Sequence, residues 1–285
     1  MNQILNNFSY VFRHPIGKKQ PVRTLLRIVN WQIRSRLIRN SYEFEWISDS
    51  KLSVKRGMRG ATGNLYYGLW EFPDMGFLIH FLRPGDLFFD IGANIGSYTV
   101  LAAKVCGAEC WSFEPAAETL PGLRENIRLN AIEPQVQVKT CALGDTNGEL
   151  TFTRGLGSMN RVAGDGDAEA EQVLVRRLDD LAGDASPIMM KIDIEGSEPA
   201  MFRGAARAMR NPALNAIIVE TIDDQIAKTL DENGFVRKYY NPFERRFESE
   251  GWKDISHNKL FIRNEASVMV RLQSAKHYHV AGVRI

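Results

Sequence analysis

The sequence predicts an α/β fold built on a doubly wound, mostly parallel sheet. Short apolar runs alternate with helical segments from about residue 84 onward, which is the pattern of repeated strand–helix units. The run at 86–90 ends in a glycine-rich turn that opens a helix, and a later run at 187–193 ends in charged residues. Ligands of such sheets bind beyond the carboxyl ends of the strands, so both turns are candidates for one site.

Composition limits the classes of function. The chain has 285 residues, of which 44% are hydrophobic and 25% charged, as in an ordinary globular protein with a buried core. A net charge of +2 gives no reason to expect a nucleic-acid partner. Cys106, Cys110 and Cys141 lack the spacing of paired metal ligands and fit reduced, buried residues. With no secretory signal and no apolar stretch long enough to cross a bilayer, we expect a cytoplasmic protein.

The N-terminal part differs from the rest, because no Asp or Glu occurs between Met1 and Tyr42. Residues 22–39 place apolar side chains three and four apart, as on one face of a helix. This helix packs on the main domain, makes a peripheral contact with the inner face of a membrane, or binds a partner. A short strand pair is expected at 42–47 and 51–56. We therefore divide the chain into a helical and hairpin extension, 1–62, and a main domain, 63–285.

The elements of the main domain follow in order. Glu71–Leu82 is expected to be helical and to end at the stop signal Arg83-Pro84-Gly85. Strands are then predicted at 86–90, 109–114, 136–141, 187–193, 215–220, 235–240 and 258–263, and helices at 97–105, 116–130, 197–209 and 223–233. Residues 155–172 lack periodicity and are rich in Gly, Asp, Glu and Ala. They are interpreted as a loop over the site or an excursion into solvent.

The turn Asp90–Gly96 is the most informative segment. Its glycines allow a ligand to approach the backbone, and the helix that follows favours electron-rich groups at its N-terminus. A fixed carboxylate at Asp90 would oppose phosphates but suit a cationic nucleoside that lacks them. The turn therefore points to S-adenosylmethionine rather than to NAD or ATP.

Two further strand ends complete the nucleoside site. Glu114 ends the next strand, where a carboxylate can accept both ribose hydroxyls. The turn from Ala142 to Asp145 follows the third strand and would lie beside the adenine. The same segment is also interpretable as a simple turn that leads to a strand at 149–153.

A second charged strand end is expected to carry the chemistry. Lys191, Asp193 and Glu195 alternate along the chain and so share one side of an extended segment, where charges are costly unless they pair or face a site. Asp193 and Glu195 are the leading candidates for a general base, or for ligands of Mg²⁺. Glu220 adds a polar group to this rim. His80 and His257 are weaker alternatives, and a structural ion pair remains an open interpretation.

These motifs, in this order, resemble the FkbM-type methyltransferases. The blocks that carry the resemblance are Pro84-Gly85-Asp86, Asp90-Ile91-Gly92-Ala93-Asn94-Ile95-Gly96, Phe113-Glu114-Pro115, Ala142-Leu143-Gly144 and Lys191-Ile192-Asp193-Ile194-Glu195-Gly196-Ser197-Glu198, within about 70–263. The resemblance implies a class I, Rossmann-like methyltransferase fold with a final antiparallel strand. It also implies S-adenosylmethionine as the cofactor and a hydroxyl of a sugar, glycan or polyketide-like product as the methyl acceptor.

The resemblance also implies roles for single residues. The methionine part of the cofactor would lie against Asp90, Gly92, Ala93, Asn94 and Gly96, the ribose against Glu114, and the adenine against Ala142, Leu143 and Asp145. The acceptor would react near Lys191, Asp193 and Glu195. The basic N-terminal residues lie outside the shared core.

Three other classes remain to be weighed. A nicotinamide dehydrogenase would need a third glycine where Tyr98 stands, and no Tyr-x-x-x-Lys motif follows. An RNA methyltransferase would carry a basic or aromatic face across its substrate, and only the N-terminus is basic. A non-catalytic nucleotide-binding scaffold would tolerate decay of the motifs, which are nearly intact. Binding of S-adenosylmethionine rather than NAD separates these classes.

Overall fold

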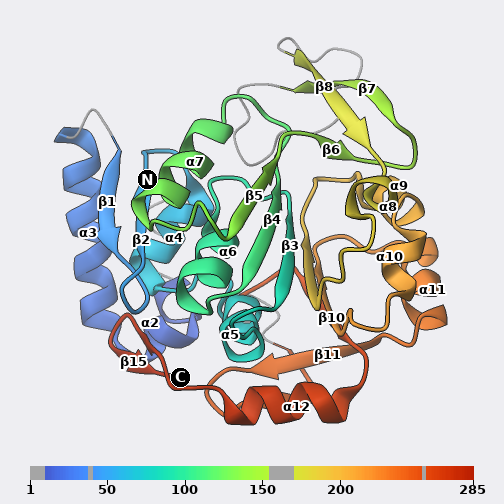
Figure 1. Ribbon diagram of the computed structural model, residues 1–285. Coiled ribbons are helices and arrows are strands. Elements are labelled where there is room, and N and C mark those ends of the chain that lie inside the picture. The colour runs from blue at the N-terminus through green and yellow to red at the C-terminus, as the bar shows by residue number, and fades with distance from the viewer. Residues whose placement is uncertain (1–9, 38–40, 154–169, 252–254) are drawn as a thin grey trace.

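The fold is organised around one eight-stranded sheet (Figure 1). The computed structural model describes residues 10–37, 41–153, 170–251 and 255–285. The strand order is β12-β11-β13-β10-β9-β3-β4-β5. The strands are β3 (Leu87–Ile91), β4 (Glu109–Phe113), β5 (Val136–Lys139), β9 (Met189–Ile192), β10 (Ala216–Val219), β11 (Val236–Asn241), β12 (Arg246–Glu248) and β13 (Lys259–Ile262). Because β13 is antiparallel to both β10 and β11, the predicted doubly wound sheet with a final antiparallel strand is confirmed.

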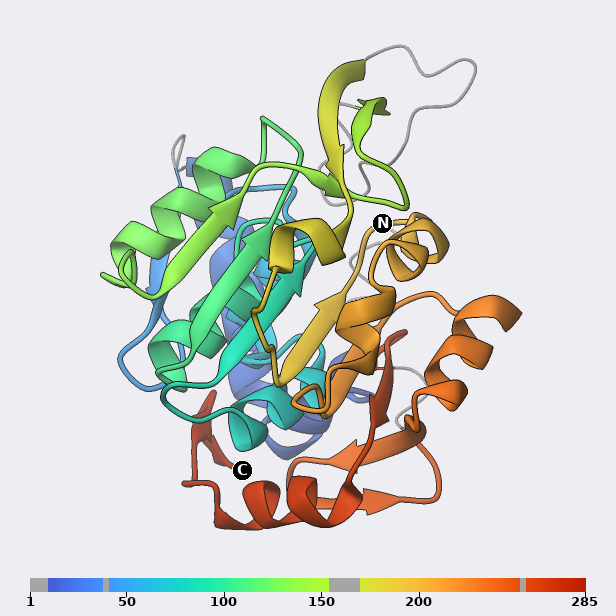
Figure 2. The same cartoon turned by 45° about the vertical axis from the view of Figure 1, so that its right-hand side comes forward.

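Helices cover both faces of this sheet (Figure 2). One face carries α5 (Phe72–Phe81), α6 (Ser97–Val100), a π-helical turn (Leu101–Val105) and α7 (Leu120–Leu129); the other carries α8 (Leu178–Ala182), α9 (Glu198–Arg203), α10 (Ala206–Arg210) and α11 (Asp224–Glu232). Phe88 belongs to the core on the first face and Phe89 to the core on the second, as the alternation of a strand requires. The helix predicted at 197–209 is interrupted at Gly204, so it forms two short helices.

A small second sheet stands beyond the carboxyl ends of the central strands (Figures 1 and 2). It consists of β6 (Ala142–Leu143), β7 (Gly148–Thr153) and β8 (Ala170–Arg176), with β8 in the middle. The loop expected at 155–172 falls largely on 154–169, outside the described residues. At 170–172 that expectation is wrong, because these residues begin β8 and pair with β7.

The N-terminal segment packs against the main domain through a helix, as one of the three interpretations expected. It comprises α2 (Pro15–Lys19), α3 (Pro21–Leu37), β1 (Tyr42–Glu45), β2 (Lys51–Val54) and α4 (Arg59–Tyr67). The buried side of α3 is formed by Thr24, Ile28 and Trp31, and not by the apolar face found in the sequence. Residues 38 and 39 lie outside the described residues. The division at residue 62 stays a prediction.

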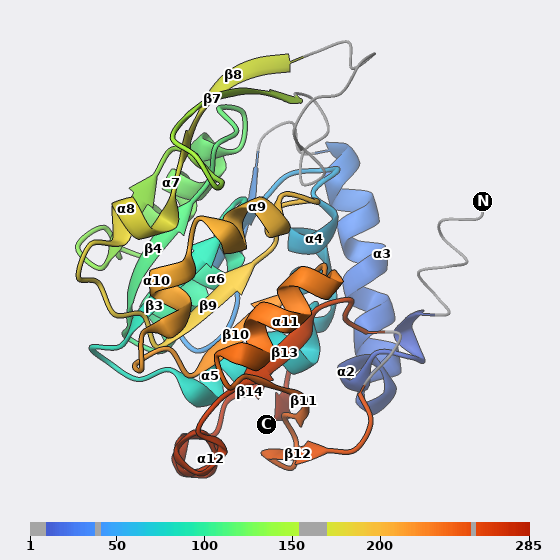
Figure 3. The same cartoon turned by 90° about the vertical axis from the view of Figure 1, so that its right-hand side faces the viewer.

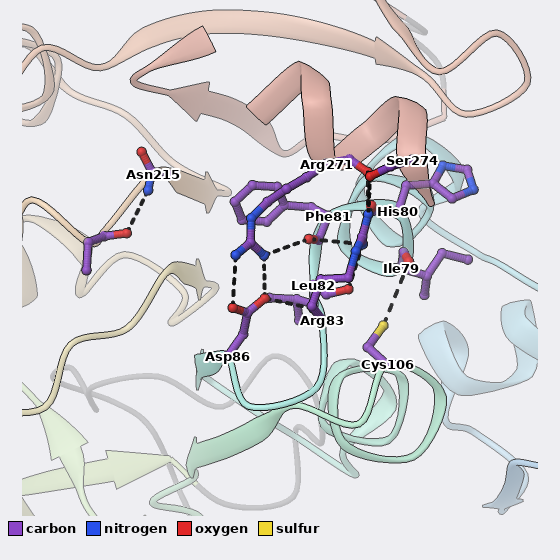
Figure 4. A network of polar contacts seen from close by, with 11 residues as sticks. Ile79, His80, Phe81, Leu82, Arg83, Asp86, Cys106, Asn215, Arg271 and Ser274 are labelled. Carbon is purple, nitrogen blue, oxygen red and sulfur yellow. Dashed lines mark hydrogen bonds and ion pairs between the residues drawn. The ribbon is translucent and has the colours of Figure 1, made fainter. Parts of the chain in front are cut away.

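The C-terminal segment is tied to the amino end of β3. Here α12 (Glu265–Ser274) precedes the short pair β14 (His279–Val280) and β15 (Val283–Arg284). Figure 4 shows the guanidinium of Arg271 facing the carboxylate of Asp86, with nitrogen–oxygen distances of 2.6 and 3.2 Å. The backbone amide of Arg83 donates to the same carboxylate. The Arg83–Asp86 turn therefore anchors α12 at the end of the sheet opposite the site.

Helix α7 attaches the β1–β2 hairpin to the glycine turn. The Asn126 side chain accepts a hydrogen bond from the amide of Ser53 at 2.7 Å and donates one to the carbonyl of Ile95 at 2.8 Å. Asn130, one turn later, exchanges two hydrogen bonds of 2.8 Å with the backbone of Lys51. Since Asn126 is fully buried, water cannot replace its bonds without a rearrangement of the segment.

We expect Asn126→Ala to lower the free energy of unfolding by about 2–4 kcal/mol, because a buried amide and a buried carbonyl both lose their partners. Urea denaturation followed by circular dichroism measures this change. The neighbouring Glu125→Ala, which removes only an exposed pair with Arg128, should cost less than about 1 kcal/mol. Equal losses in the two variants would contradict the role given to Asn126.

Candidate active site

A cleft of about 560 Å³, counted with its open mouth, lies at the carboxyl ends of β3, β4 and β9. Its lining comprises Ile91, Gly92, Asn94, Phe113, Glu114, Pro115, Thr119, Cys141, Ala142, Leu143, Phe152, Asp193, Ile194, Glu195 and Ser197. The structure thus brings together seven of the sequence-predicted residues: Gly92, Asn94, Glu114, Ala142, Leu143, Asp193 and Glu195.

Gly92 is required by a contact within the protein. Its φ is +82°, and a Cβ added there would lie 1.8 Å from the backbone oxygen of Asp193. The amide of Asp193 in turn donates to the carbonyl of Ile91 at 3.0 Å. The turns after β3 and β9 therefore pack backbone to backbone, and this close approach excludes any side chain at position 92.

Glu114 holds the glycine turn while it faces the cleft. Its carboxylate accepts hydrogen bonds from the amides of Asn94 at 2.8 Å and Ala116 at 2.9 Å. Burial raises the pKa of Glu114 to about 7, although these two amides counteract the shift. A carboxylate oxygen has two lone pairs, so both oxygens can also accept hydrogen bonds from ligand hydroxyls.

Asp90, whose carboxylate we expected to face a ligand, is buried and is not among the residues that line the cleft. It is 1% exposed and accepts a hydrogen bond from the hydroxyl of Thr99 at 2.6 Å. Its neighbours in register are Ser112 on β4 and Lys191 on β9. Burial raises the pKa of Asp90, and the nearby Lys191 ammonium opposes that shift. The carboxylate is thus a partner of a buried cation.

Three other predicted cofactor residues lie behind or beside the cleft. The amide of Ala93 donates to the carbonyl of Phe113, and its side chain is buried in the core near α7. Gly96, at φ +87°, precedes α6 and packs against Leu123. Asp145 forms an ion pair of 2.8 Å with Arg203 on the surface. None of the three is among the cleft-lining residues, so the structure does not bring them together with the other predicted cofactor residues.

Lys191 is the buried cation, and it lies beneath the cleft. It is 4% exposed, and its ammonium nitrogen is 2.5 Å from a carboxylate oxygen of Asp193. The same nitrogen lies 4.8 Å from the ring centre of Tyr98, whose hydroxyl donates to Glu71 at 2.6 Å. Burial would lower the pKa of Lys191, but the carboxylates of Asp193, Glu71 and Asp90 raise it overall. Lys191 therefore stays charged and positions Asp193.

Asp193 presents an ionised carboxylate to the cleft. Burial by itself would raise its pKa, but the charge and hydrogen bond of Lys191 bring the pKa below its ordinary value. Burial and the Asp193 charge raise the pKa of Glu220 to about 8, so Glu220 is protonated at neutral pH and shares a hydrogen bond with Asp193. One oxygen each of Asp193, Glu195 and Glu220 lies within 4.8 Å of the others, a donor set that a hard cation such as Mg²⁺ accepts.

The two histidine alternatives lie elsewhere. His80 is fully buried, with its Nδ1 2.8 Å from the hydroxyl of Tyr240, and burial lowers its pKa to about 3. His257 is exposed and does not line the cleft. Sequence reasoning missed Phe152, which β7 brings to the cleft, and Glu71 and Tyr98, which surround Lys191. The strand expected at Glu149–Thr153 was the only feature of the sequence that pointed to Phe152.

The lining fits an adenosine-type cofactor. Phe113, Leu143 and Phe152 provide apolar surface for a flat base, and Glu114 provides acceptors for sugar hydroxyls. The oxygens of Asp193 and Glu195 add negative charge at the other end, which suits a cationic group without phosphates. Such a cofactor would span from the β4 end to the β9 end of the cleft.

Comparison with known proteins supports this interpretation of the cleft. The family model described as the methyltransferase FkbM domain matches residues 90–247, more than half of the chain. The 31-O-demethyl-FK506 methyltransferase FkbM of Streptomyces tacrolimicus is 30% identical over 178 residues, covering 50% of this chain and 67% of that protein. The hexuronic acid methyltransferase AglP of Haloferax volcanii is 25% identical over 146 residues, covering 50% of this chain and 59% of its own length.

A solved structure adds a weak likeness. An S-adenosylmethionine-dependent O-methyltransferase from Thermotoga maritima aligns with a TM-score of 0.40 and 13% identity, covering 67% of this chain and 64% of that one.

We expect Gly92→Ala to destabilise the protein by at least about 2 kcal/mol more than Gly196→Ala. Both positions have a positive φ, which costs an alanine roughly 1–2 kcal/mol. Only at position 92 would the new Cβ meet backbone, because nothing lies within 4 Å at position 196. Urea denaturation of the two variants measures the difference. Equal destabilisation would show that the turns do not pack as described.

Proposed function

The chain belongs to the FkbM family of S-adenosylmethionine-dependent methyltransferases, and on that premise we propose that it methylates a hydroxyl group. The acceptor class is a sugar, a glycan or a polyketide-like product. The observation that carries the proposal is the ionised carboxylate of Asp193, held by Lys191 in the same cleft as the nucleoside-type lining. The printed names of the two relatives, a hexuronic acid and an FK506 methyltransferase, support this acceptor class.

Glu114, Asn94, Ala142 and Leu143 would hold the cofactor. Ribose hydroxyls would donate to Glu114, and the adenine would lie against the apolar wall that Leu143 helps to form. The bound cofactor supplies a methyl group on a positively charged sulfur. The protein has to align the acceptor oxygen with that group and to keep water away.

Asp193 would orient the acceptor hydroxyl and remove its proton. A hydroxyl oxygen that gains a methyl group becomes strongly acidic, so a base of low pKa can accept the proton as the new bond forms. The lowered pKa of Asp193 is therefore compatible with this role. Glu220 would hydrogen-bond to the carboxylate of Asp193, and Glu195 would lie at the rim of the cleft.

Metal binding is a second role for the same carboxylates, favoured by the proximity of Asp193, Glu195 and Glu220. In that case Mg²⁺ would be held by oxygen ligands and would lower the pKa of the bound hydroxyl. The ion pair with Lys191 competes with such a cation for Asp193. Turnover in the presence of EDTA, compared with added Mg²⁺, distinguishes the two roles.

The raised pKa of Glu114 predicts that the cofactor binds more weakly in acid. If only the ionised carboxylate accepts the ribose hydroxyls, a pKa of about 7 makes the affinity fall about tenfold between pH 8 and pH 6. Calorimetric titration of S-adenosylmethionine into wild type and Glu114→Gln measures this. The variant should bind the cofactor weakly at both pH values, and its affinity should not show this tenfold change with pH.

The comparison isolates Glu114, because titration of the ligand itself is common to both proteins. Glu109→Gln, at the exposed start of the same strand, should behave as wild type. An identical pH dependence in wild type and Glu114→Gln would remove Glu114 from the cofactor site.

We expect Asp193→Asn to lower turnover roughly a hundredfold or more, the usual loss when a general base is removed. The acceptor would first be found by transfer of labelled methyl groups into pools of uronic acid glycans and polyketides. Cofactor affinity should fall by a much smaller factor than turnover, because Asp193 adds only part of the negative charge near the cofactor but acts directly on the acceptor hydroxyl. That affinity also shows that the variant folds.

Asp145→Asn, which alters only the surface pair with Arg203, should keep full turnover. Unchanged turnover in Asp193→Asn would reject Asp193 as the base. Methylation found only on nitrogen or carbon atoms of the product would reject the hydroxyl acceptor while leaving methyl transfer intact.

A further inference from the structure

Helix α3 carries an apolar stripe on its outer side. Five large apolar side chains are between 46% and 77% exposed: Val22, Leu26, Val29, Ile33 and Leu37. Their spacing of four, three, four and four residues places them along one line of the helix. The buried residues Thr24, Ile28 and Trp31 point to the opposite side. Within the described part of the chain, nothing covers this stripe.

The surroundings of the stripe are basic. Arg23, Arg34 and Arg36 on the same helix are exposed, as are Lys18 and Lys19 on the preceding helix α2. The first carboxylates in the sequence are Glu43 and Glu45 on β1, and Glu45 pairs with Lys51 within the hairpin. The charged side chains of α3 itself are all cations, and an apolar line beside cations is complementary to a surface that is apolar inside and negatively charged at its boundary.

We propose that α3 lies flat on an anionic lipid bilayer, with the stripe buried between the headgroups and the acyl chains and the flanking arginines among the lipid phosphates. No helix within the described ranges is long and apolar enough to cross a membrane, so the contact is peripheral. This contact does not depend on the proposed methyl transfer.

The position of α3 in the fold allows such a contact. Figure 3 shows the helix along one flank of the molecule, with its inner side against the domain. Arg27, on that inner side, donates hydrogen bonds to the carbonyls of Tyr66 and Ala281 at 3.1 and 2.8 Å. These bonds fix the rotation of the helix and keep the stripe outward. No residue of α3 lines the cleft.

A second copy of the chain is a poorer occupant. In a symmetric dimer the stripe would meet itself, and each set of flanking arginines would meet the same set. The exposed positions of α3 offer no carboxylate to pair with them. Like charges at such a seam destabilise the pairing, whereas lipid phosphates neutralise the same charges.

Sedimentation of the full chain with vesicles tests the proposal. One set contains phosphatidylcholine alone and the other adds phosphatidylserine. We expect the wild type to sediment with the anionic vesicles, less with the neutral ones, and less again when salt is raised. Leu26→Ser with Ile33→Ser should weaken the binding to anionic vesicles by about tenfold or more, because two membrane-facing side chains are lost.

The matched control is Val236→Ser with Val270→Ser, which alters two apolar side chains that are 57% and 67% exposed on β11 and α12. This control should bind as the wild type does, and both double variants should keep the wild-type melting temperature. Failure of the wild type to bind anionic vesicles would overturn the proposal, as would equal weakening by both double variants. Analytical ultracentrifugation tests the other occupant. If the wild type is a dimer that does not bind vesicles, and only the Leu26→Ser/Ile33→Ser variant is a monomer, the stripe belongs to an interface with a second copy.

Discussion

A buried ammonium group in the central sheet sets the charge pattern of the cleft. Removing Lys191 from water costs several kcal/mol unless partners compensate for the lost hydration. The structure provides three carboxylates, those of Asp193, Asp90 and Glu71, and the face of the Tyr98 ring. Each partner comes from a different segment. The cation therefore ties β3, β9, α6 and the start of α5 together directly beneath the place where ligands bind.

This arrangement divides the acidic residues into two groups. Asp90 and Glu71 compensate the charge of Lys191 inside the protein. Asp193 also compensates this charge, but it lines the cleft as well. Burial raises the pKa of Glu114 to about 7, and burial together with the charge of Asp193 raises the pKa of Glu220 to about 8. One ionised carboxylate thus stands between two that titrate near neutral pH. The cleft has different chemistry at its two ends for this reason.

The sequence allowed the sheet, its antiparallel last strand and most cleft residues to be predicted, because buried strands and glycine turns are coded locally. The function of Asp90 was not predictable in this way. Its carboxylate faces inward because Lys191 and Ser112 lie beside it in register, and register between strands is not visible in one segment. The same holds for α3, where the apolar pattern was read correctly but Thr24 and Trp31 form the packed side. Strand β8 was not predicted, because it forms by pairing with β7 and its own sequence carries no clear strand pattern.

The backbone contact between Gly92 and Asp193 has a consequence for engineering new acceptor preferences. The backbones of the two turns are in direct contact. The chain up to Asp193 therefore cannot be lengthened or rerouted without displacing the turn after β3. Beyond that residue the constraint ends, since Gly196 has open space around it. Diversity on the proposed acceptor side should therefore be introduced after Asp193, where Ile194, Glu195 and Ser197 line the cleft. Libraries built there would vary selectivity while the donor half of the enzyme keeps its shape.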